Sequence, residues 1–442
     1  MSAIKDGMIK KSRKILKRAL ILGAAGRDFH NAMMICDEYY IAAFTHGQLP
    51  INKKFFPSKY LGYRVPIYKE KHIEAVIKKH KITDVFFSYS DVPFDHVMKI
   101  ASISIANNTR FHLLGKETML KSKKKVIAVT ATRTGSGKSP ITELISLYLR
   151  RKGFNVGIIR HPMPYRNLNR DIEVFKKLDD LKHLTIEEAE DFERHIRNGF
   201  TVYAGIDYKK VLATAEKQHD ILLWDGGNND FPFIKSDLWI CIADAMRAND
   251  EIKYYPGMVN FLNADLIIIS KYNINKKARK GKEIIEMHAR ELNKRAKVFY
   301  MKFDVYQDKK IEIKGKNVLI IEDGPSITHG NREYGAGFVY AKKMGANIID
   351  ARKYVSNSRF YRDIYNEYKH INSVVPAIGY DKYQLKALEQ FINSINADYV
   401  LIATPTDLEK RIMINKPIIN IYYKATINNE KAFFHFIDEH IG

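Results

Sequence analysis

The stretch Val126-Ile-Ala-Val-Thr-Ala-Thr-Arg-Thr-Gly-Ser-Gly-Lys-Ser139 decides the fold of this 442-residue chain. Its apolar first half predicts a β-strand, its second half is a glycine-rich loop, and the apolar spacing from Ile141 to Leu149 predicts a helix. A strand, a glycine loop and a helix in this order cradle phosphate, because backbone N–H groups and the helix dipole stabilise an anion at the helix start. The sequence therefore predicts a P-loop that binds a nucleoside triphosphate.

The residues of this loop have distinct expected roles. Lys138 is expected to reach the β- and γ-phosphate oxygens, and the Ser139 hydroxyl to ligate Mg²⁺. The common P-loop pattern has glycine where Thr132 stands. The alternative to a P-loop is therefore a glycine-rich turn with a chance Gly-Lys-Ser. However, the loop resembles the Thr-Gly-x-Gly-Lys loop of dethiobiotin synthetase. The predicted nucleotide-binding residues are Thr134, Gly135, Ser136, Gly137, Lys138 and Ser139.

A second apolar run, residues 220–225, ends in Asp225 and leads into Gly226 and Gly227. In P-loop proteins an acid at this place holds Mg²⁺ beside the loop serine. A strand-terminal aspartate is also a common turn former, but its occurrence together with the loop favours the metal. We therefore predict that Ser139 and Asp225 hold the metal ion, and that the polar glycine segment approaches a ligand.

Bulk composition excludes several classes of protein. No apolar run approaches the roughly 20 residues of a membrane span, and the basic N-terminus lacks the apolar core of a secretory signal. The two cysteines, Cys36 and Cys241, are far apart and are typical of free thiols in a reducing compartment. The sequence thus predicts a cytoplasmic protein without a membrane partner.

The net charge of +23 and the pI near 9.6 have three explanations. They are lysines spread over solvated helix faces, a polyanionic small substrate drawn in by a positive field, or a nucleic acid. Because the lysines are scattered, solvated helix faces explain much of this charge, and a small polyanionic substrate is predicted as the main alternative. No RNA-binding aromatic signature appears, so we predict no nucleic-acid partner. A homodimer is expected, since two-fold association is the commonest soluble assembly.

The order of predicted elements gives an α/β protein of three domains. Residues 1–122 alternate strands and helices, which predicts a Rossmann-like domain; residues 123–305 form the P-loop domain with a parallel sheet, and residues 306–442 a smaller α/β domain. The Gly23-x-x-Gly26 turn lacks the full dinucleotide fingerprint, and the next strand ends without a ribose-binding acid. NAD binding is therefore not expected, and an anion site beside Arg27 and His30 stays open.

Eight strings spread along the chain form a family pattern: Leu22-Gly-Ala-Ala-Gly-Arg-Asp-Phe-His-Asn31, Thr134-Gly-Ser-Gly-Lys-Ser139, Ile159-Arg-His-Pro-Met-Pro-Tyr165, Thr185-Ile-Glu-Glu188, Val202-Tyr-Ala-Gly-Ile-Asp-Tyr208, Trp224-Asp-Gly-Gly-Asn-Asn-Asp230, Glu322-Asp-Gly-Pro325 and Thr404-Pro-Thr-Asp-Leu408. Together they resemble the archaeal cyclic 2,3-diphosphoglycerate synthetase family, over nearly the whole chain. The resemblance implies ATP-dependent closure of 2,3-diphosphoglycerate to its cyclic phosphoanhydride with release of ADP and phosphate, and hence ATP and Mg²⁺ as cofactors.

Joining two phosphates requires several cations, and this selects the remaining candidates. Arg160 and His161 follow a strand and are expected to lie exposed at the carboxyl edge of the sheet. For Arg133 the alternative is a solvent-exposed loop arginine, and for His161 a backbone cap. The predicted catalytic residues are Lys138, Arg133 and Asp225, and the predicted substrate-binding residues are Arg160, His161, Gly226, Gly227, Asn228 and Asn229.

The nucleotide base is predicted from a further motif. The string Ser270-Lys-Tyr-Asn273 stands where GTPases carry Asn/Thr-Lys-x-Asp, but Asn273 replaces the acid that pairs with guanine, so ATP is expected. Glu187 and Glu188 either act on Mg²⁺ or form a solvated helix face. The alternative functions are a P-loop GTPase or ATPase switch, a kinase of another small phosphorylated acid, and a nucleic-acid-binding ATPase.

Overall fold

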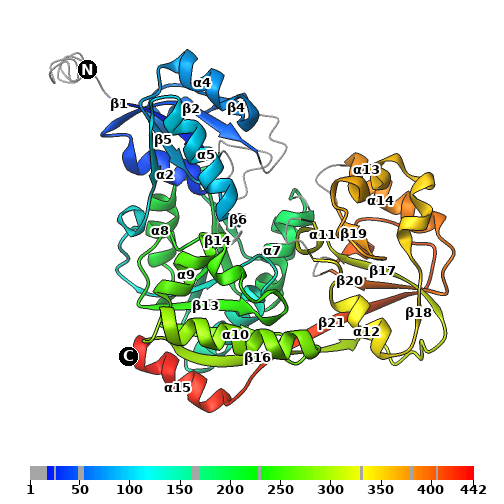
Figure 1. Ribbon diagram of the computed structural model, residues 1–442. Coiled ribbons are helices and arrows are strands. Elements are labelled where there is room, and N and C mark those ends of the chain that lie inside the picture. The colour runs from blue at the N-terminus through cyan, green and yellow to red at the C-terminus, as the bar shows by residue number, and fades with distance from the viewer. Residues whose placement is uncertain are drawn as a thin grey trace. The chain divides into compact units, whose positions relative to one another are not determined.

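The computed structural model (Figure 1) describes residues 17–23, 26–47, 54–160, 170–184, 186–226, 230–328, 332–378, 382–404 and 407–442, without the side chains of 186–188, 190 and 191. The chain divides into two compact units. The first unit comprises Met1–Tyr89, Asp95–Thr118 and Pro164–Arg170, and the second comprises Ser90–Phe94, Met119–Met163 and Asp171–Gly442. The predicted domains 123–305 and 306–442 thus fall almost wholly in the second unit, and the predicted boundary between them lies within a single strand, β16 (Lys297–Gln307).

The first unit contains the predicted alternation of strands and helices. Its described strands form a sheet in the order β3-β4-β2-β1-β5-β7, parallel except for β3. The sequence prediction found the inner strands and the flanking helices but missed the short β3 and β4. The elements are β1 (Lys17–Leu22), α2 (Arg27–Ile35), β2 (Tyr39–His46), β3 (Phe55–Phe56), α3 (Ser58–Leu61), β4 (Val65–Lys69), α4 (Ile73–His80), β5 (Asp84–Phe87), α5 (Phe94–Ala106) and β7 (Arg110–Leu113).

The second unit is built on one continuous sheet, which has 13 strands within the described residues. Its first half has the order β10-β11-β9-β12-β8-β13-β15-β16 and is parallel apart from β10. The strands of this half are β8 (Lys125–Ala131), β9 (Val156–Arg160), β10 (Glu173–Phe175), β11 (Thr201–Ala204), β12 (Ile221–Asp225), β13 (Leu238–Asp244) and β15 (Leu266–Ser270). Its helices are α6 (Lys138–Arg151), α7 (Ile186–Arg197), α8 (Tyr208–Glu216), α9 (Gly257–Asn263) and α10 (Lys276–Leu292).

The second half continues the sheet in the order β21-β20-β17-β18, with β19 beside β17, and all of these pairs are parallel. Its strands are β17 (Asn317–Asp323), β18 (Asn347–Ile348), β19 (Val375–Ala377), β20 (Tyr399–Ala403) and β21 (Ile418–Ile427). Its helices are α11 (Gly324–Ile327), α12 (Ala336–Lys343), α13 (Arg359–Glu367) and α14 (Lys382–Ser394), and α15 (Glu430–Ile441) follows β21. Apart from this sheet, β6 (Val92–Pro93) and β14 (Tyr254–Tyr255) pair as a two-stranded antiparallel ribbon.

The central strand β8 shows why the apolar runs became buried strands. Alternate side chains of a strand point to opposite faces, and here both faces carry helices. Ile127 and Val129 pack in one core with Ile141 and Ile145 of α6. Val126 and Ala128 belong to the core on the other side, which includes the α8 side chains. A parallel sheet covered on both faces needs such continuous apolar strands.

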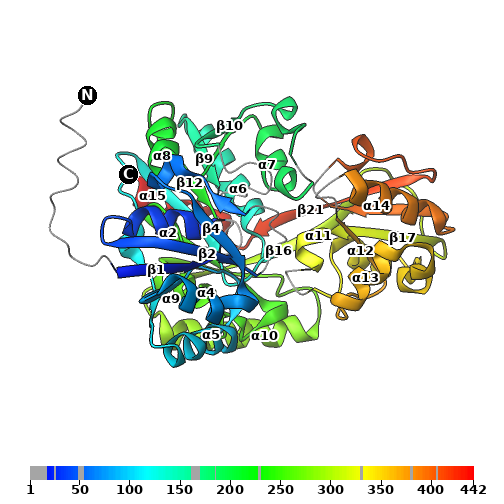
Figure 2. The ribbon, with the colours of Figure 1, turned by 90° about the horizontal axis from the view of Figure 1, so that it is seen from above.

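A long antiparallel pair joins the two halves of this sheet. β16 lies parallel to β15, while β21 lies parallel to β20, and the two strands pair with each other from Met301 opposite Ile427 to Gln307 opposite Ile421. Figure 2 shows β16 and β21 passing from the P-loop half to the C-terminal half. Among the described residues, no helix has both the length and the apolar character needed to cross a membrane.

A buried glutamate lies at the carboxyl end of β17. The Glu322 side chain accepts the N–H of Phe338 at 2.9 Å, and a Cβ on Gly335 would lie only 2.3 Å from Glu322 Oε2, so a larger residue there would displace the carboxylate. Burial raises the pKa of Glu322 from 4.5 to about 8. Hydrogen bonds from the backbone N–H groups of Gly335, Gly337 and Phe338 lower the pKa but do not outweigh burial. The folded state therefore retains a proton that the unfolded chain loses.

This raised pKa predicts a pH-dependent stability. Because the folded-state pKa lies above the unfolded value, the contribution is full below about pH 4.5 and is lost as the pH rises through about 8. Between pH 5 and 9 the free energy of unfolding should fall relative to Glu322→Gln by an amount on the order of a few kcal/mol. Chemical denaturation across this range measures the difference, with Glu439→Gln on the exposed side of α15 as control. Parallel curves for the wild type and Glu322→Gln would contradict the prediction.

Candidate functional site

The P-loop has the predicted strand–loop–helix geometry. β8 ends at Ala131, the loop follows, and α6 begins at Lys138. Gly135 and Gly137 have φ values of +74° and +113°, the left-handed region that favours glycine. A Cβ on Gly137 would also lie 2.8 Å from Phe303 Cζ and 2.9 Å from Met301 Cε. The two glycines therefore fix the turn that places Lys138 and Ser139 at the helix start.

A buried charge cluster lies beside the loop serine. Asp225 at the end of β12 stands opposite Arg160 of β9 in the strand register. Arg160 Nη1 donates to Asp225 Oδ2, His195 Nε2 of α7 lies 2.8 Å from the same oxygen, and Arg160 Nη1 is 3.5 Å from Ser139 Oγ. The pairing follows from the register, because opposite positions on neighbouring strands bring a cation and an anion together.

The charge of Asp225 follows from these neighbours. Burial alone would raise its pKa, but the positive charge of Arg160, the hydrogen bond with His195 and the charge of Lys138 together hold the pKa of Asp225 well below its usual range. Asp225 is therefore ionised at neutral pH although it is fully buried.

The residues around Asp225 fit a magnesium ion. Asp225 Oδ1 is buried and has no hydrogen-bond partner among the described residues. An ionised carboxylate with a free oxygen, and a serine hydroxyl that lies 3.5 Å from the same Arg160 Nη1, offer the hard oxygen ligands that Mg²⁺ takes from a protein. Within the described residues, no cluster of three or more His, Cys, Asp or Glu side chains forms a separate metal site.

The structure corrects the expected exposure of the acceptor side. We expected Arg160 to lie exposed at the sheet edge, but only 2% of it is exposed. The reason is that β9 is an inner strand and the Asp225 carboxylate lies opposite Arg160. We expected the Gly226 amide to be open to an anion. Its N–H instead donates to the Val129 carbonyl at 3.1 Å. The other predicted acceptor residues, His161, Gly227, Asn228 and Asn229, lie outside the described residues, as do the side chains of Glu187 and Glu188.

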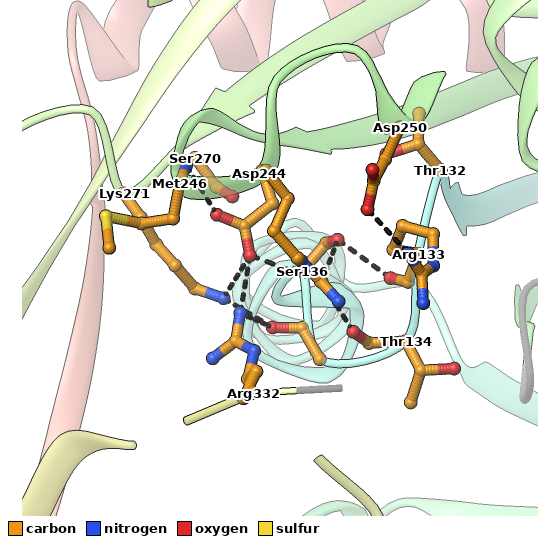
Figure 3. A network of polar contacts seen from close by, with 12 residues as sticks. Thr132, Arg133, Thr134, Ser136, Asp244, Met246, Asp250, Ser270, Lys271 and Arg332 are labelled. Atoms are coloured by element: carbon orange, nitrogen blue, oxygen red, sulfur yellow. Dashed lines mark hydrogen bonds and ion pairs between the residues drawn. The ribbon is translucent and has the colours of Figure 1, made fainter. Parts of the chain in front are cut away.

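Arg133 points away from solvent into a carboxylate pair. Its Nε lies 2.6 Å from Asp91 Oδ1, its Nη1 lies 2.5 Å from Asp250 Oδ2, and its guanidinium stacks 3.6 Å above the ring of Tyr254. The Arg133–Asp250 pair is visible in Figure 3. The alternative of a solvent-exposed loop arginine is therefore wrong, and the catalytic role of Arg133 stays a prediction.

A second charge cluster, absent from the sequence prediction, lies at the ends of β13 and β15 (Figure 3). Asp244 Oδ2 accepts Lys271 Nζ at 2.9 Å, Arg332 Nη2 at 2.5 Å and Arg247 Nη2 at 3.3 Å. Asp244 ends an apolar strand as Asp225 does, so the same signal would have found it. No pattern in the sequence indicated Arg332, which comes from the C-terminal half of the unit.

The start of α2 in the first unit does not support the anion site that the sequence left open. The Asp28 carboxylate accepts the Gly26 N–H at 2.6 Å, and a Cβ on Gly23 would lie 2.9 Å from Asp28 Cβ. An acid already occupies the helix start, where it would repel a second anion.

Curated relatives and solved structures resemble this chain, whereas no family model matches it. Arginine synthetase ArcE of Thermococcus kodakarensis is 45% identical over 428 residues, 93% of this chain and 94% of that protein. Cyclic 2,3-diphosphoglycerate synthetase of the same organism is 25% identical over 207 residues, 45% of this chain and 44% of that protein. The structure of LpxK from Aquifex aeolicus in complex with ATP aligns with a TM-score of 0.44 at 13% identity, covering 79% of this chain and 96% of that chain.

These findings confirm the predicted resemblance only in part. The similarity to cyclic 2,3-diphosphoglycerate synthetase covers less than half of the chain, where we expected it over nearly all of it. The match along nearly the full length is to a synthetase with a different product in its name.

Proposed function

This chain belongs to the family of the arginine synthetase ArcE, and from that premise we propose that it is an ATP-dependent synthetase that forms arginine. The observation that carries the proposal is 45% identity over 93% of this chain and 94% of the relative. The P-loop with Lys138, and the ionised Asp225 beside Ser139, support the use of ATP with Mg²⁺.

The precursor follows from the chemistry of the product. A synthetase that forms the guanidinium group of arginine must replace an oxygen on the terminal carbon by nitrogen, and the corresponding oxygen compound is the ureido amino acid citrulline. Transfer of the γ-phosphoryl group to the ureido oxygen makes that oxygen a leaving group. Ammonia then attacks the carbon, the C–O bond breaks, and inorganic phosphate leaves with the former ureido oxygen. The products are arginine, ADP and phosphate.

The residues of the P-loop half take the following roles in this proposal. The backbone N–H groups of Gly135 and of residues 137–139 hold the phosphates, since those of Thr134 and Ser136 already donate to Asp91 and to the Arg133 carbonyl. Lys138 stabilises charge on the transferring phosphoryl group. Ser139 and Asp225 would hold Mg²⁺, which supplies further neutralisation of phosphate charge. Arg160 and His195 orient the Asp225 carboxylate, so we assign Arg160 a positioning role in place of acceptor contact. Acceptor contacts by Arg133, His161 and the segment 227–229 remain part of the proposal, while the Gly226 amide is already bonded to Val129.

Cyclic 2,3-diphosphoglycerate synthesis is the second candidate function. It is favoured by the 25% identity over 207 residues and by the surplus of cations around the loop. Both reactions begin with transfer of the γ-phosphoryl group to an acceptor oxygen, and both end with release of phosphate, so the same P-loop residues serve either. The shorter and weaker similarity places this candidate second. A homodimer, a cytoplasmic location and the absence of a nucleic-acid partner complete the proposal.

Incubation of the purified chain with ATP, Mg²⁺, citrulline and ¹⁵N-ammonium tests the proposal. We expect ¹⁵N-labelled arginine by mass spectrometry, with ADP and phosphate formed in equal amounts. Citrulline labelled with ¹⁸O in the ureido group should pass its label to phosphate, because that oxygen leaves with the phosphoryl group.

A parallel incubation with 2,3-diphosphoglycerate, followed by ³¹P NMR, discriminates between the two candidates. Cyclic product without arginine would overturn the first candidate in favour of the second. Release of AMP and pyrophosphate in place of ADP and phosphate would overturn γ-phosphoryl activation in both.

A further inference from the structure

The P-loop has a metal side and an opposite side, set by the strand order. Ser139 Oγ lies 3.5 Å from Nη1 of Arg160 at the end of β9, and the same Nη1 donates to Asp225 at the end of the neighbouring β12. Ser139 and Asp225 would hold the metal ion that neutralises phosphate charge during transfer, and since they lie on the β12 side of β8, we place the γ-phosphate on that side. The nucleoside end must then leave the loop on the other side of β8, toward the ends of β13 and β15.

Surplus positive charge is buried on that opposite side. Three cationic side chains, Lys271, Arg247 and Arg332, each form an ion pair with the carboxylate of Asp244, and they are only 9%, 14% and 18% exposed. Burial lowers the pKa of Arg247 to about 10, Asp244 opposes this effect and Arg332 adds to it, so Arg247 stays charged at neutral pH. Buried charge without a full counter-charge is costly, and an anionic ligand would compensate it.

The same cations lie against the outer carbonyl groups of the loop. Lys271 Nζ donates to the Gly135 carbonyl at 2.5 Å and Arg332 Nη2 donates to it at 2.7 Å, while Arg247 Nη2 donates to the Thr134 carbonyl at 2.7 Å. Figure 3 shows Lys271 and Arg332 converging on Asp244 beside the loop. Cations therefore follow the rim of the loop on the side of β13 and β15.

The C-terminal half of the unit supplies one of the cations at the loop carbonyls, Arg332. Arg332 precedes α12, and its Nε lies 3.2 Å from the position that a Cβ on Gly135 would take. Arg332 Nε is buried and has no hydrogen-bond partner in the described part of the chain. A buried donor beside the loop, without a partner among the described residues, is typical of a group that bonds a ligand.

We propose that Arg332, together with Lys271, binds the nucleoside-proximal phosphate of a bound nucleotide, and that Asp244 holds both cations in place before the nucleotide arrives. The ligand class is a nucleoside di- or triphosphate, since both contain this phosphate. The C-terminal half thereby completes the nucleotide site. This assignment rests on the proposed use of ATP but not on the identity of the acceptor.

Calorimetric titration of the full chain with ADP and with the β,γ-imido analogue of ATP, each with Mg²⁺, tests this proposal. Arg332→Ala should weaken both nucleotides by the same factor, about 10- to 100-fold, since it removes one charge-assisted contact to a phosphate that both contain. Arg332→Lys should lose less, because it keeps the charge but not the planar fork. The matched control is Arg352→Ala, an exposed arginine of the same half that pairs with Asp350 and should bind both nucleotides as the wild type does.

Three results would overturn the proposal. Unchanged affinity for both nucleotides in a folded Arg332→Ala protein would make Arg332 a packing contact of the loop. Loss confined to the ATP analogue would place Arg332 on the γ-phosphate. If Arg332→Ala does not fold, the variants Arg332→Lys and Lys271→Met replace it. Wild-type affinity for both nucleotides in both of these variants would also overturn the proposal. The titration contains no acceptor, so failure of arginine synthesis leaves its result intact, whereas a wild-type chain that binds neither nucleotide refutes the proposed function itself.

Discussion

Lys138→Ala is expected to lower the rate of ADP formation by about 10³-fold, the order of magnitude that one preorganised charge contributes at a transferring phosphoryl group. Lys138 is the first residue of α6 and is only 8% exposed, so its position is fixed by the helix and the left-handed Gly137 before it. Alanine keeps the helix start but removes the cation. A coupled assay of ADP release measures the effect, with Lys217→Ala, an exposed lysine after α8, as the control.

The fold of this variant must be shown to be intact for the result to count. Near-UV circular dichroism and the melting temperature should match the wild type within a few degrees, because the loop glycines and the α6 core remain. A folded Lys138→Ala protein with an unchanged rate of ADP formation would contradict the P-loop assignment.

Arg160→Ala is expected to lower the free energy of unfolding by about 3–5 kcal/mol at neutral pH, since it leaves the Asp225 carboxylate buried without its main counter-ion. The folded-state pKa of Asp225 is depressed, so the wild-type contribution is present above the unfolded pKa of about 4 and is lost as the pH falls below it. The deficit of the variant should therefore shrink in acid. Chemical denaturation at neutral pH and near pH 3 measures both effects.

A double variant separates stability from catalysis at this pair. Arg160→Met with Asp225→Leu removes both charges, and well-packed apolar replacements of a buried ion pair are often neutral or stabilising. We expect it to regain most of the lost stability while forming no ADP, because the metal ligand is absent. As control, Arg352→Ala breaks an exposed pair and should cost about 0–1 kcal/mol. A similarly small cost for Arg160→Ala would show that Asp225 is not held by Arg160.

Local patterns in the sequence predicted most of the parallel sheet. The apolar runs of β8, β9, β12, β13 and β15 and the glycine loop depend on neighbouring residues only, and the structure confirms them. The boundary after residue 305 reflected a charged segment that looked like a linker. The continuous sheet could not be inferred, because β16 pairs with β21 across more than a hundred residues and no local pattern encodes that partner.

The site was predicted less completely for the same reason. Lys138, Ser139 and Asp225 belong to short motifs, whereas the contact between Arg332 and Gly135 joins residues 197 positions apart. The exposure of Arg160 was wrong because a strand end says nothing of the side chain opposite it in the register. His195 carried no signal, since it lies in an amphipathic helix where a histidine is unremarkable by itself.

The late return of β21 and α15 has a consequence for synthesis on the ribosome. Phe433, Ile437 and Ile441 of α15 belong to the same core as the side chains of β8 and α6. During translation the P-loop half emerges with this part of its core uncovered and with the edge of β16 unpaired, until residues 418–441 have left the exit tunnel. A long unpaired strand edge is a template for wrong pairing with other chains. Nascent chains that stall before β21 should therefore be the ones that depend most on chaperones.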